Sequence, residues 1–353
     1  MYLLPALLLA AAWPVLAQPT VERSRLVALS ASVVKVEVQR RQGGYSLGSG
    51  VVVAPGRVAT NCHVTRDADT IQVQRGGVRW PADAQAIRPD LDLCVLRVPE
   101  LRGEPVDLGS AEQLKPGDPV AALGFTGGAG LQVSDGQVIA LHRHARGQVV
   151  QSSNWFTSGA SGGGLFDDRL RLVGLLTFRL RGGASHYFAA PADWLQPLLA
   201  ADAPFRPIAP LDGAAPPFWQ QAVGQQPWFL QAAALEQAMQ WPALLSLSGR
   251  WAEGDQDDAE PWYLRGLSLE RLDRLDDARQ ALEAALRRQP DSLQAWHRLG
   301  LVLIRQGQLA LARQALSRLH GREPLLAEQL QQALDHACQT PSPQPAECRS
   351  DPA

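Results

Sequence analysis

The feature that most constrains the fold is a repeat of 34 residues in the second half of the chain. Six positions recur at this spacing, in the pairs Trp262 and Trp296, Gly266 and Gly300, Leu269 and Leu303, Ala278 and Ala312, Leu282 and Leu316, and Pro290 and Pro324. A period of this length indicates pairs of helices that stack on one another to bury a shared core. The small residues let paired helices approach closely, and the proline ends the second helix of each unit.

Within each unit, Trp, Gly, Ala and Pro stand where the tetratricopeptide pattern has them, so this region resembles tetratricopeptide repeats. We expect clear repeats at 259–292 and 293–326, and a degenerate one at 225–258. Together they define a helical domain over 227–330, followed by a C-terminal tail at 331–353. The alternative is an unrelated helical bundle that has this spacing by coincidence.

The first half has a different pattern, in which short β-branched runs alternate with glycine-containing turns. The runs are Val33–Val38, Gly50–Val53, Leu91–Val98, Val138–Leu141 and Leu172–Phe178. Many short strands at regular spacing predict an antiparallel barrel or sandwich over 24–200, closed by a short helix at Ala192–Leu199. The proline-rich stretch at 201–226 is typical of a linker.

Composition limits the function classes. A chain of 353 residues is long enough for two domains with separate cores. With 46% hydrophobic and 19% charged residues and a net charge of −2, neither a disordered chain nor a strongly basic nucleic-acid binder is expected.

The N-terminus indicates export. Residues 1–17 are apolar and end in Val15-Leu16-Ala17, which predicts a signal peptide cleaved after Ala17 and a periplasmic or secreted protein. No Lys or Arg precedes the apolar run, so an uncleaved membrane anchor is the alternative. Pro5 and Pro14 interrupt the run, which is shorter than the roughly 20 residues of a spanning helix.

Export allows disulfides, and four cysteines allow three connectivities. Cys338 and Cys348 are close in sequence and are expected to pair in the C-terminal tail, which leaves Cys62 and Cys94 for each other. The alternative for the latter two is a pair of buried thiols. No cysteine or histidine stands at metal-ligand spacing, and we expect no metal and no cofactor. His142 and His144 share one strand face but lack a third ligand, so we expect them to face solvent.

Three segments of the first half fit one mechanism. They are a TN-x-HV box with His63, an Asp-Leu-x-x-Leu strand that starts at Asp92, and a G-x-S-G-G elbow with Ser161. The order His, Asp, Ser is that of the chymotrypsin-like double β-barrel. With the Gly48-Ser49-Gly50 strand and the closing segment 187–194, residues 24–200 resemble the trypsin-like serine proteases, and among them the bacterial HtrA-type group.

The chemistry explains this set of residue types. A serine hydroxyl needs a base to take its proton, so Ser161 needs His63, and a carboxylate must orient that histidine, so His63 needs Asp92. Asp90 lies in the same segment, but the apolar run begins directly after Asp92. The N–H groups of Gly159 and Ser161 are expected to form the oxyanion hole.

The resemblance also implies the substrate contacts. Thr177, Phe178 and Arg179 should pair with an extended substrate backbone, while Trp155, Phe156, Thr157 and Ser158 should line a modest apolar specificity pocket. A bridge between Cys62 and Cys94 would brace the histidine and aspartate segments, which lie side by side in the family.

These observations predict an all-β chymotrypsin-like double β-barrel followed by an all-α tetratricopeptide domain. The predicted function is an exported serine endopeptidase that acts on protein or peptide substrates. The repeats would bind a protein partner, and their acidic composition favours a basic or amphipathic segment. The alternatives are a catalytically silent scaffold and an acyl hydrolase that uses the same residues. Neither nucleic-acid binding nor a stable membrane span after signal cleavage is expected.

Overall fold

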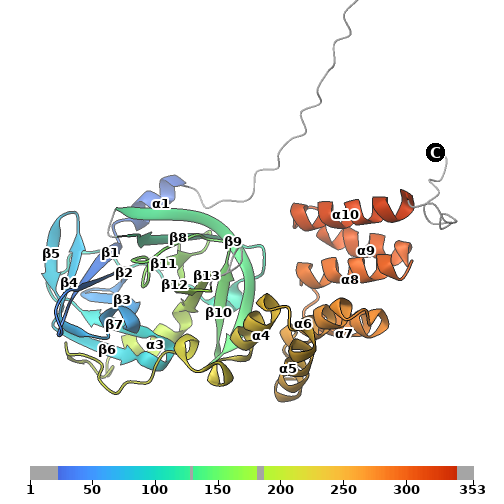
Figure 1. Cartoon of the computed structure of the whole chain (residues 1–353). Coiled ribbons are helices and arrows are strands. Elements are labelled where there is room, and N and C mark those ends of the chain that lie inside the picture. Colours follow the sequence, from blue (N-terminus) through green and yellow to red (C-terminus); the bar gives the residue numbers. More distant parts are fainter. Residues whose placement is uncertain (1–22, 128–129, 181–186, 340–353) are drawn as a thin grey trace, which may run out of the picture.

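The computed structural model describes residues 23–127, 130–180 and 187–339. The strands gather at one end of the molecule and the long helices at the other, as Figure 1 shows. A short helix, α1 (Arg23–Leu29), precedes the first strand.

The first sheet has eight strands in the order β14-β6-β7-β3-β2-β1-β4-β5, and its pairings are antiparallel. Its strands are β1 (Val33–Arg40), β2 (Tyr45–Ala54), β3 (Arg57–Asn61), β4 (Ala68–Arg75), β5 (Val78–Pro81), β6 (Ala84–Arg88), β7 (Leu93–Arg97) and β14 (Arg206–Pro207). The interior is filled by β-branched side chains such as Val36, Val38 and Ile71, which alternate with more exposed residues along their strands.

The second sheet closes into a barrel in the order β10-β13-β12-β11-β8-β9. Its strands are β8 (Pro119–Phe125), β9 (Leu131–His144), β10 (Gly147–Ser152), β11 (Gly164–Phe166), β12 (Leu172–Arg179) and β13 (Tyr187–Pro191). The 3-10 helix η3 (Ala192–Leu195) and helix α3 (Gln196–Leu199) follow β13, over the range predicted as the closing helix.

The remaining helices stack as antiparallel hairpins. They are α4 (Trp228–Gln237), α5 (Trp241–Gly254), α6 (Glu260–Arg271), α7 (Leu275–Arg288), α8 (Leu293–Arg305), α9 (Leu309–Leu319) and α10 (Pro324–Gln339). The repeated glycines lie where helices touch: a Cβ on Gly266 would come within 2.6 Å of the Leu282 side chain, and one on Gly300 within 2.5 Å of Leu330. The predicted fold class, an all-β domain followed by an all-α repeat domain, is confirmed.

The helical domain extends further than the repeat spacing predicted. Helix α10 continues to Gln339, and its residues Leu330 and Leu334 are buried against the preceding repeat. Residues 331–339 therefore form part of the domain and not of a tail. A final helix of this kind covers the apolar face that the last repeat would otherwise expose.

The segment between the two domains is packed onto the barrel. β14 pairs with β6, Leu211 packs beside Cys62 and Cys94, and Phe218 in the 3-10 helix η4 (Phe218–Gln220) is 2% exposed. Proline-rich composition predicted a linker, but the apolar side chains within the segment hold it against the surface.

The helices α4 to α6 share a core with the β domain. One continuous cluster of buried side chains joins Phe188 and Trp194 of the barrel to Phe229, Leu244 and Leu264 of the helices. The later repeats have a cluster of their own, centred on Leu282 and Leu316. Within the described residues, no helix combines the length and apolar character needed to cross a membrane.

Candidate functional site

The site is organised by the pairing of β3 with β7, which sets Asn61 opposite Leu93. His63 lies on the short helix α2 (Cys62–Thr65) that follows β3, and Asp92 ends the 3-10 helix η1 (Pro89–Leu91) that precedes β7. The register of the two strands therefore brings the histidine and the aspartate together, although 29 residues separate them.

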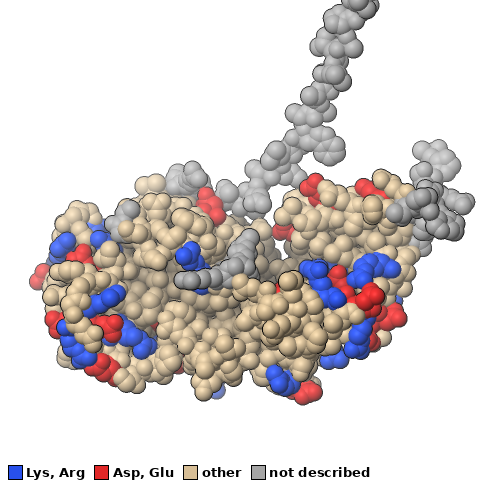
Figure 2. All heavy atoms as spheres, in the orientation of Figure 1, with Lys and Arg blue, Asp and Glu red and all other residues tan. Residues whose placement is uncertain are grey.

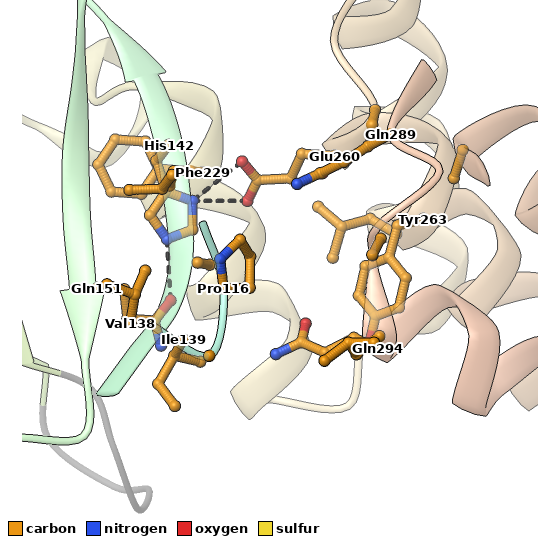
Figure 3. A pocket seen from close by; sticks show the side chains of 18 of the residues that line it. Pro116, Val138, Ile139, His142, Gln151, Phe229, Glu260, Tyr263, Gln289 and Gln294 are labelled. Carbon is orange, nitrogen blue, oxygen red and sulfur yellow. Dashed lines mark hydrogen bonds and ion pairs between the residues drawn. The ribbon is translucent and has the colours of Figure 1, made fainter. Parts of the chain in front are cut away.

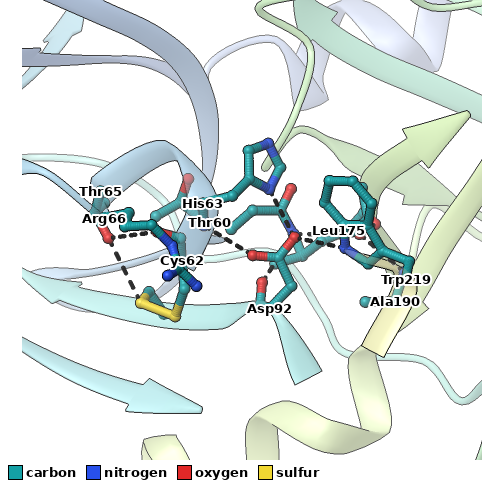
Figure 4. Close-up of polar contacts among 12 residues, drawn as sticks. Thr60, Cys62, His63, Thr65, Arg66, Asp92, Leu175, Ala190 and Trp219 are labelled. Atoms are coloured by element: carbon teal, nitrogen blue, oxygen red, sulfur yellow. Dashed lines mark hydrogen bonds and ion pairs between the residues drawn. A yellow bond between two sulfur atoms is a disulfide. The ribbon is translucent and has the colours of Figure 1, made fainter. Parts of the chain in front are cut away.

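Asp92 is fully buried, and its carboxylate accepts three hydrogen bonds (Figure 4). Oδ1 accepts from the backbone N–H of His63 at 2.8 Å, and Oδ2 lies 2.6 Å from His63 Nδ1. The indole Nε1–H of Trp219 also donates to Oδ2, at 3.1 Å. Three donors stabilise a charge that would otherwise be costly to bury.

The backbone of Asp92 is fixed as firmly as its side chain. Its carbonyl accepts from the backbone N–H of Cys62 at 3.1 Å and from Nδ2 of Asn61 at 3.0 Å. Its φ of 61° is left-handed, a conformation that aspartate adopts more readily than most residues. By contrast, Asp90 faces solvent and pairs with Arg88 at 3.0 Å.

A disulfide joins Cys62 and Cys94, whose Cα atoms are 5.0 Å apart. The predicted pairing of these two cysteines is confirmed. The bond ties α2 to β7, one residue before His63 and two after Asp92. Cys348 lies outside the described residues, so its predicted pairing with Cys338 stays a prediction.

Ser161 lies in a tight elbow that only glycine permits on both sides. Gly159 and Gly162 have φ of 98° and 84°. A Cβ on Gly162 would lie 2.2 Å from the Ser49 carbonyl oxygen, and one on Gly159 would lie 2.6 Å from that of Phe125. The N–H groups of Gly159 and Ser161 have no acceptor within the described part of the chain, whereas Ala160 and Gly162 both donate to carbonyls.

Gly48 on β2 is the point where the elbow and α2 meet. A Cβ there would lie 2.5 Å from a Val64 methyl group and 3.2 Å from the Ser161 carbonyl oxygen. Ser161 is thus near α2, but among the described residues no hydrogen bond joins its hydroxyl to His63. Catalytic hydrogen bonds are often long before substrate binds.

The predicted substrate contacts lie around this elbow in different environments. Trp155 is 55% exposed, whereas Phe156 is buried against Tyr187 at a ring distance of 5.0 Å. Both line a small cavity of about 30 Å³ beside Ala160. Thr157 is half-buried and Ser158 exposed on the way to the elbow.

The other predicted contacts end β12. Thr177 is buried and accepts from the backbone N–H of Ala190, Phe178 is 6% exposed, and Arg179 is exposed. The ring of Phe178 is covered by Trp219, which stacks on it at 5.2 Å.

The sequence motifs do not predict a role for Trp219. It approaches Asp92 from 127 residues away, in a segment whose composition predicted only a linker. The one signal in the sequence is the aromatic pair Phe218-Trp219, since linkers rarely contain large apolar residues.

The prediction that His142 faces solvent is wrong. His142 on β9 is buried because helix α4 covers it, with Phe229 stacked on its ring at 4.4 Å. Its Nδ1 lies 2.8 Å from Glu260 of α6, and its Nε2 lies 2.9 Å from Gln151 (Figure 3). Burial lowers the pKa of His142. The charge of Glu260 and the hydrogen bonds with Glu260 and Gln151 outweigh burial and raise this pKa above its ordinary value.

A cavity of about 560 Å³ lies between β9 and the helical domain, next to this pair. Glu236, Glu260 and Glu323 line it, and its described lining includes no Lys or Arg. On the face shown in Figure 2, charged side chains gather toward the two ends of the molecule, and the surface between them is largely uncharged.

Residues 48–175 match the family model of the trypsin-like peptidase domain. This part of the chain is therefore similar to trypsin-like peptidase domains. Residues 263–324 match the tetratricopeptide repeat model, so the resemblance found in the motifs holds for both domains.

Curated relatives match the peptidase domain. The serine endoprotease DegS of Haemophilus influenzae is 32% identical over 164 residues, which cover 42% of this chain and 47% of that protein. A probable periplasmic serine endoprotease DegP-like of Ectopseudomonas mendocina is 36% identical, over 38% of this chain and 30% of that protein. The chain spans less than half the length of these relatives.

Among solved structures, the Rv3671c protease from Mycobacterium tuberculosis in its active form aligns with a TM-score of 0.48 and 23% identity. The alignment covers 60% of this chain and 96% of that one. The HtrA-type protease AlgW with a tripeptide aligns at 0.46 and 27% identity, over 50% of this chain and 63% of that one.

Proposed function

We propose that this chain is an exported serine endopeptidase in which Ser161, His63 and Asp92 are the catalytic residues. The observation that carries the proposal is the buried Asp92, whose Oδ2 lies 2.6 Å from Nδ1 of His63. This contact fixes the tautomer in which Nε2 of His63 lacks a proton and acts as a base. The glycine elbow that holds Ser161 beside α2 supports the third assignment.

In the proposed mechanism, His63 takes the proton of the Ser161 hydroxyl as its oxygen attacks the substrate carbonyl. The negative charge then develops on the carbonyl oxygen. The N–H groups of Gly159 and Ser161, which have no acceptor among the described residues, would stabilise it. His63 gives the proton to the departing amine, and water hydrolyses the acyl-enzyme in a second step of the same kind. The buried charge of Asp92 stabilises the imidazolium in both steps.

We assign substrate binding to the residues around the elbow. The strand end Thr177–Arg179 would pair with an extended substrate, and the cavity beside Trp155 and Phe156 would take the side chain before the cleaved bond. Its small size favours small apolar side chains.

We assign partner binding to the helical domain. The cavity between the two domains is lined by three glutamates, which favours a basic or amphipathic segment of another protein. A partner bound there would touch the peptidase domain as well as the repeats. The relatives that are named periplasmic agree with the export predicted from residues 1–17.

The test is labelling with a fluorophosphonate, which reacts with an activated serine. Wild type should label stoichiometrically and Ser161→Ala should not label, while Ser317→Ala, at an exposed serine on α9, serves as the control substitution and should label like wild type. Equal background labelling of wild type and Ser161→Ala would contradict the proposal. A casein digest then separates a peptidase from an esterase.

A catalytically silent scaffold is the second candidate. One observation favours it: the Ser161 hydroxyl forms no hydrogen bond with His63 in the described structure. The same labelling experiment decides between the two, because a scaffold leaves wild type and Ser161→Ala alike.

A further inference from the structure

Trp219 lies on the segment between the domains, yet its side chain is part of the proposed active site. Its indole N–H donates to Oδ2 of Asp92, the same oxygen that contacts His63 Nδ1. Its ring stands edge-on to the His63 ring, with the ring centroids 5.5 Å apart and an interplanar angle of 86°. Figure 4 labels both residues beside Asp92. Trp219 thus contacts both members of the proposed catalytic pair.

Among the described residues, only His63 and Trp219 donate to the Asp92 carboxylate. The Thr177 hydroxyl belongs to the same hydrogen-bond network, since Asn61 Nδ2 contacts both Thr177 Oγ1 and the Asp92 carbonyl. However, a hydroxyl has one proton, and that of Thr177 is donated to the Leu175 carbonyl at 2.7 Å. Without Trp219, the Asp92 carboxylate would keep only the two hydrogen bonds that come from His63 itself.

The helical domain holds Trp219 in place through a chain of hydrogen bonds. Nε2 of Gln231, on α4, donates to the Gln226 carbonyl at 2.7 Å, and Nε2 of Gln226 donates to the Trp219 carbonyl at 3.2 Å. On its other side, Phe218 is buried against Trp194 at a ring distance of 6.1 Å. The indole is therefore positioned by the first helix of the repeats as well as by the barrel.

We propose that Trp219 is a positioning residue for the pair His63 and Asp92, and that α4 sets its position through Gln226. This inference rests on the proposed peptidase function. The indole N–H fixes the plane of the Asp92 carboxylate, so that Oδ2 stays aligned with Nδ1 of His63. The edge of the ring restricts rotation of the imidazole, so that Nδ1 keeps facing Asp92.

The test compares Trp219→Phe, which keeps an aromatic ring but removes the N–H, with Trp228→Phe as the matched control. Trp228 begins α4 and is 38% exposed. We expect Trp219→Phe to lower kcat about 10-fold with KM within about 2-fold, the loss expected for one hydrogen bond to a buried charge. Trp228→Phe should keep both values, and thermal melting should show that both variants fold.

A second readout does not depend on turnover. The proton between His63 Nδ1 and Asp92 Oδ2 should give a downfield proton NMR signal, which a merely structural change elsewhere would not move. We expect this signal to shift or broaden in Trp219→Phe and to stay in place in Trp228→Phe.

Gln226→Ala tests the link to α4 while leaving the indole intact. We expect kcat to fall in the same direction but by a smaller factor, about 2- to 5-fold, because the indole loses one of its supports. Unchanged kcat together with an unchanged NMR signal would overturn the link.

The outcomes separate this inference from the proposed function. Suppose that the wild type labels with fluorophosphonate. If Trp219→Phe then has the same kcat and the same NMR signal as the wild type, the positioning role is overturned. A variant faster than wild type also overturns it, because the indole would then obstruct substrate. A wild type that does not label contradicts the proposed function, and the NMR signal still decides whether Trp219 positions the pair.

Discussion

The described part of the chain contains two histidine–carboxylate pairs with nearly equal distances and different environments. His63 and Asp92 lie 2.6 Å apart, and His142 and Glu260 lie 2.8 Å apart. The His63 side chain is 23% exposed and its Nε2 has no partner among the described residues, whereas both ring nitrogens of His142 are bonded and its side chain is 8% exposed. A histidine is free to exchange a proton with a substrate only where one nitrogen is left open, so the first pair is suited to chemistry and the second to holding two domains together.

The largest effect should come from Asp92→Asn. The amide keeps the shape of the carboxylate but favours the wrong tautomer of His63, so we expect kcat to fall about 10⁴-fold. Peptide hydrolysis measured at equal folded concentration checks this, and a loss below about 10-fold would show that His63 works without its partner.

The disulfide gives the next largest effect, on stability. The double variant Cys62→Ala/Cys94→Ala opens a link between residues 32 apart in sequence, which should lower the free energy of unfolding by about 3–4 kcal/mol. Urea denaturation measures it. Because β3 and β7 remain paired, the variant should still label with fluorophosphonate at low temperature.

Glu260→Gln should weaken the second pair and leave the proposed catalytic pair intact. Loss of the partner of a buried histidine should lower the free energy of unfolding by about 1–3 kcal/mol, with little change in kcat. Thermal melting and a peptide assay on the same samples separate the two effects.

The second pair also predicts a pH dependence. Because the folded pKa of His142 is raised, its stabilising effect is complete below the ordinary value of 6.5 and is lost as the pH rises through the folded pKa. Burial and the charge of Glu260 also raise the pKa of Asp258 to about 6, which has the same sign. Stability should fall as the pH rises from 3.8 to about 6, where Asp258 ionises in the folded protein, and again above pH 6.5, where His142 loses its proton. In Glu260→Gln the second fall should shrink, because the carboxylate that raises the pKa of His142 is gone. A flat profile in wild type would contradict the assignment.

The smallest effect should come from Asp90→Asn, the control for Asp92→Asn. Asp90 forms a surface ion pair with Arg88, and such pairs contribute about 0–1 kcal/mol. We expect unchanged kcat and a melting temperature within a few degrees of wild type. A large loss of activity would mean that the two aspartates have exchanged roles.

The two histidine–carboxylate pairs also show which features the sequence predicts and which it does not. The motifs around His63 and Ser161 and the 34-residue spacing of Gly266 and Gly300 are local patterns, and they were sufficient to predict both folds. Trp219 and His142 could not be understood in this way, because their partners lie 127 and 118 residues away and no periodicity connects them. The contact of Trp219 depends on how the segment between the domains packs on the barrel, and that of His142 on how the helices pack there. The sequence pattern of either domain alone does not predict this packing.

The continuous core that joins the barrel to helices α4, α5 and α6 limits which part of the helical region can be replaced by another. Replacing the entire helical region would expose apolar surface on the barrel and remove the support of Trp219. An exchange after α6 would leave this core in place and would disturb the separate cluster around Leu282 and Leu316, together with the hydrogen bond from Gln137 of β9 to Glu323. The interchangeable part of this protein therefore begins inside the helical repeats, well after the proline-rich segment where the composition changes.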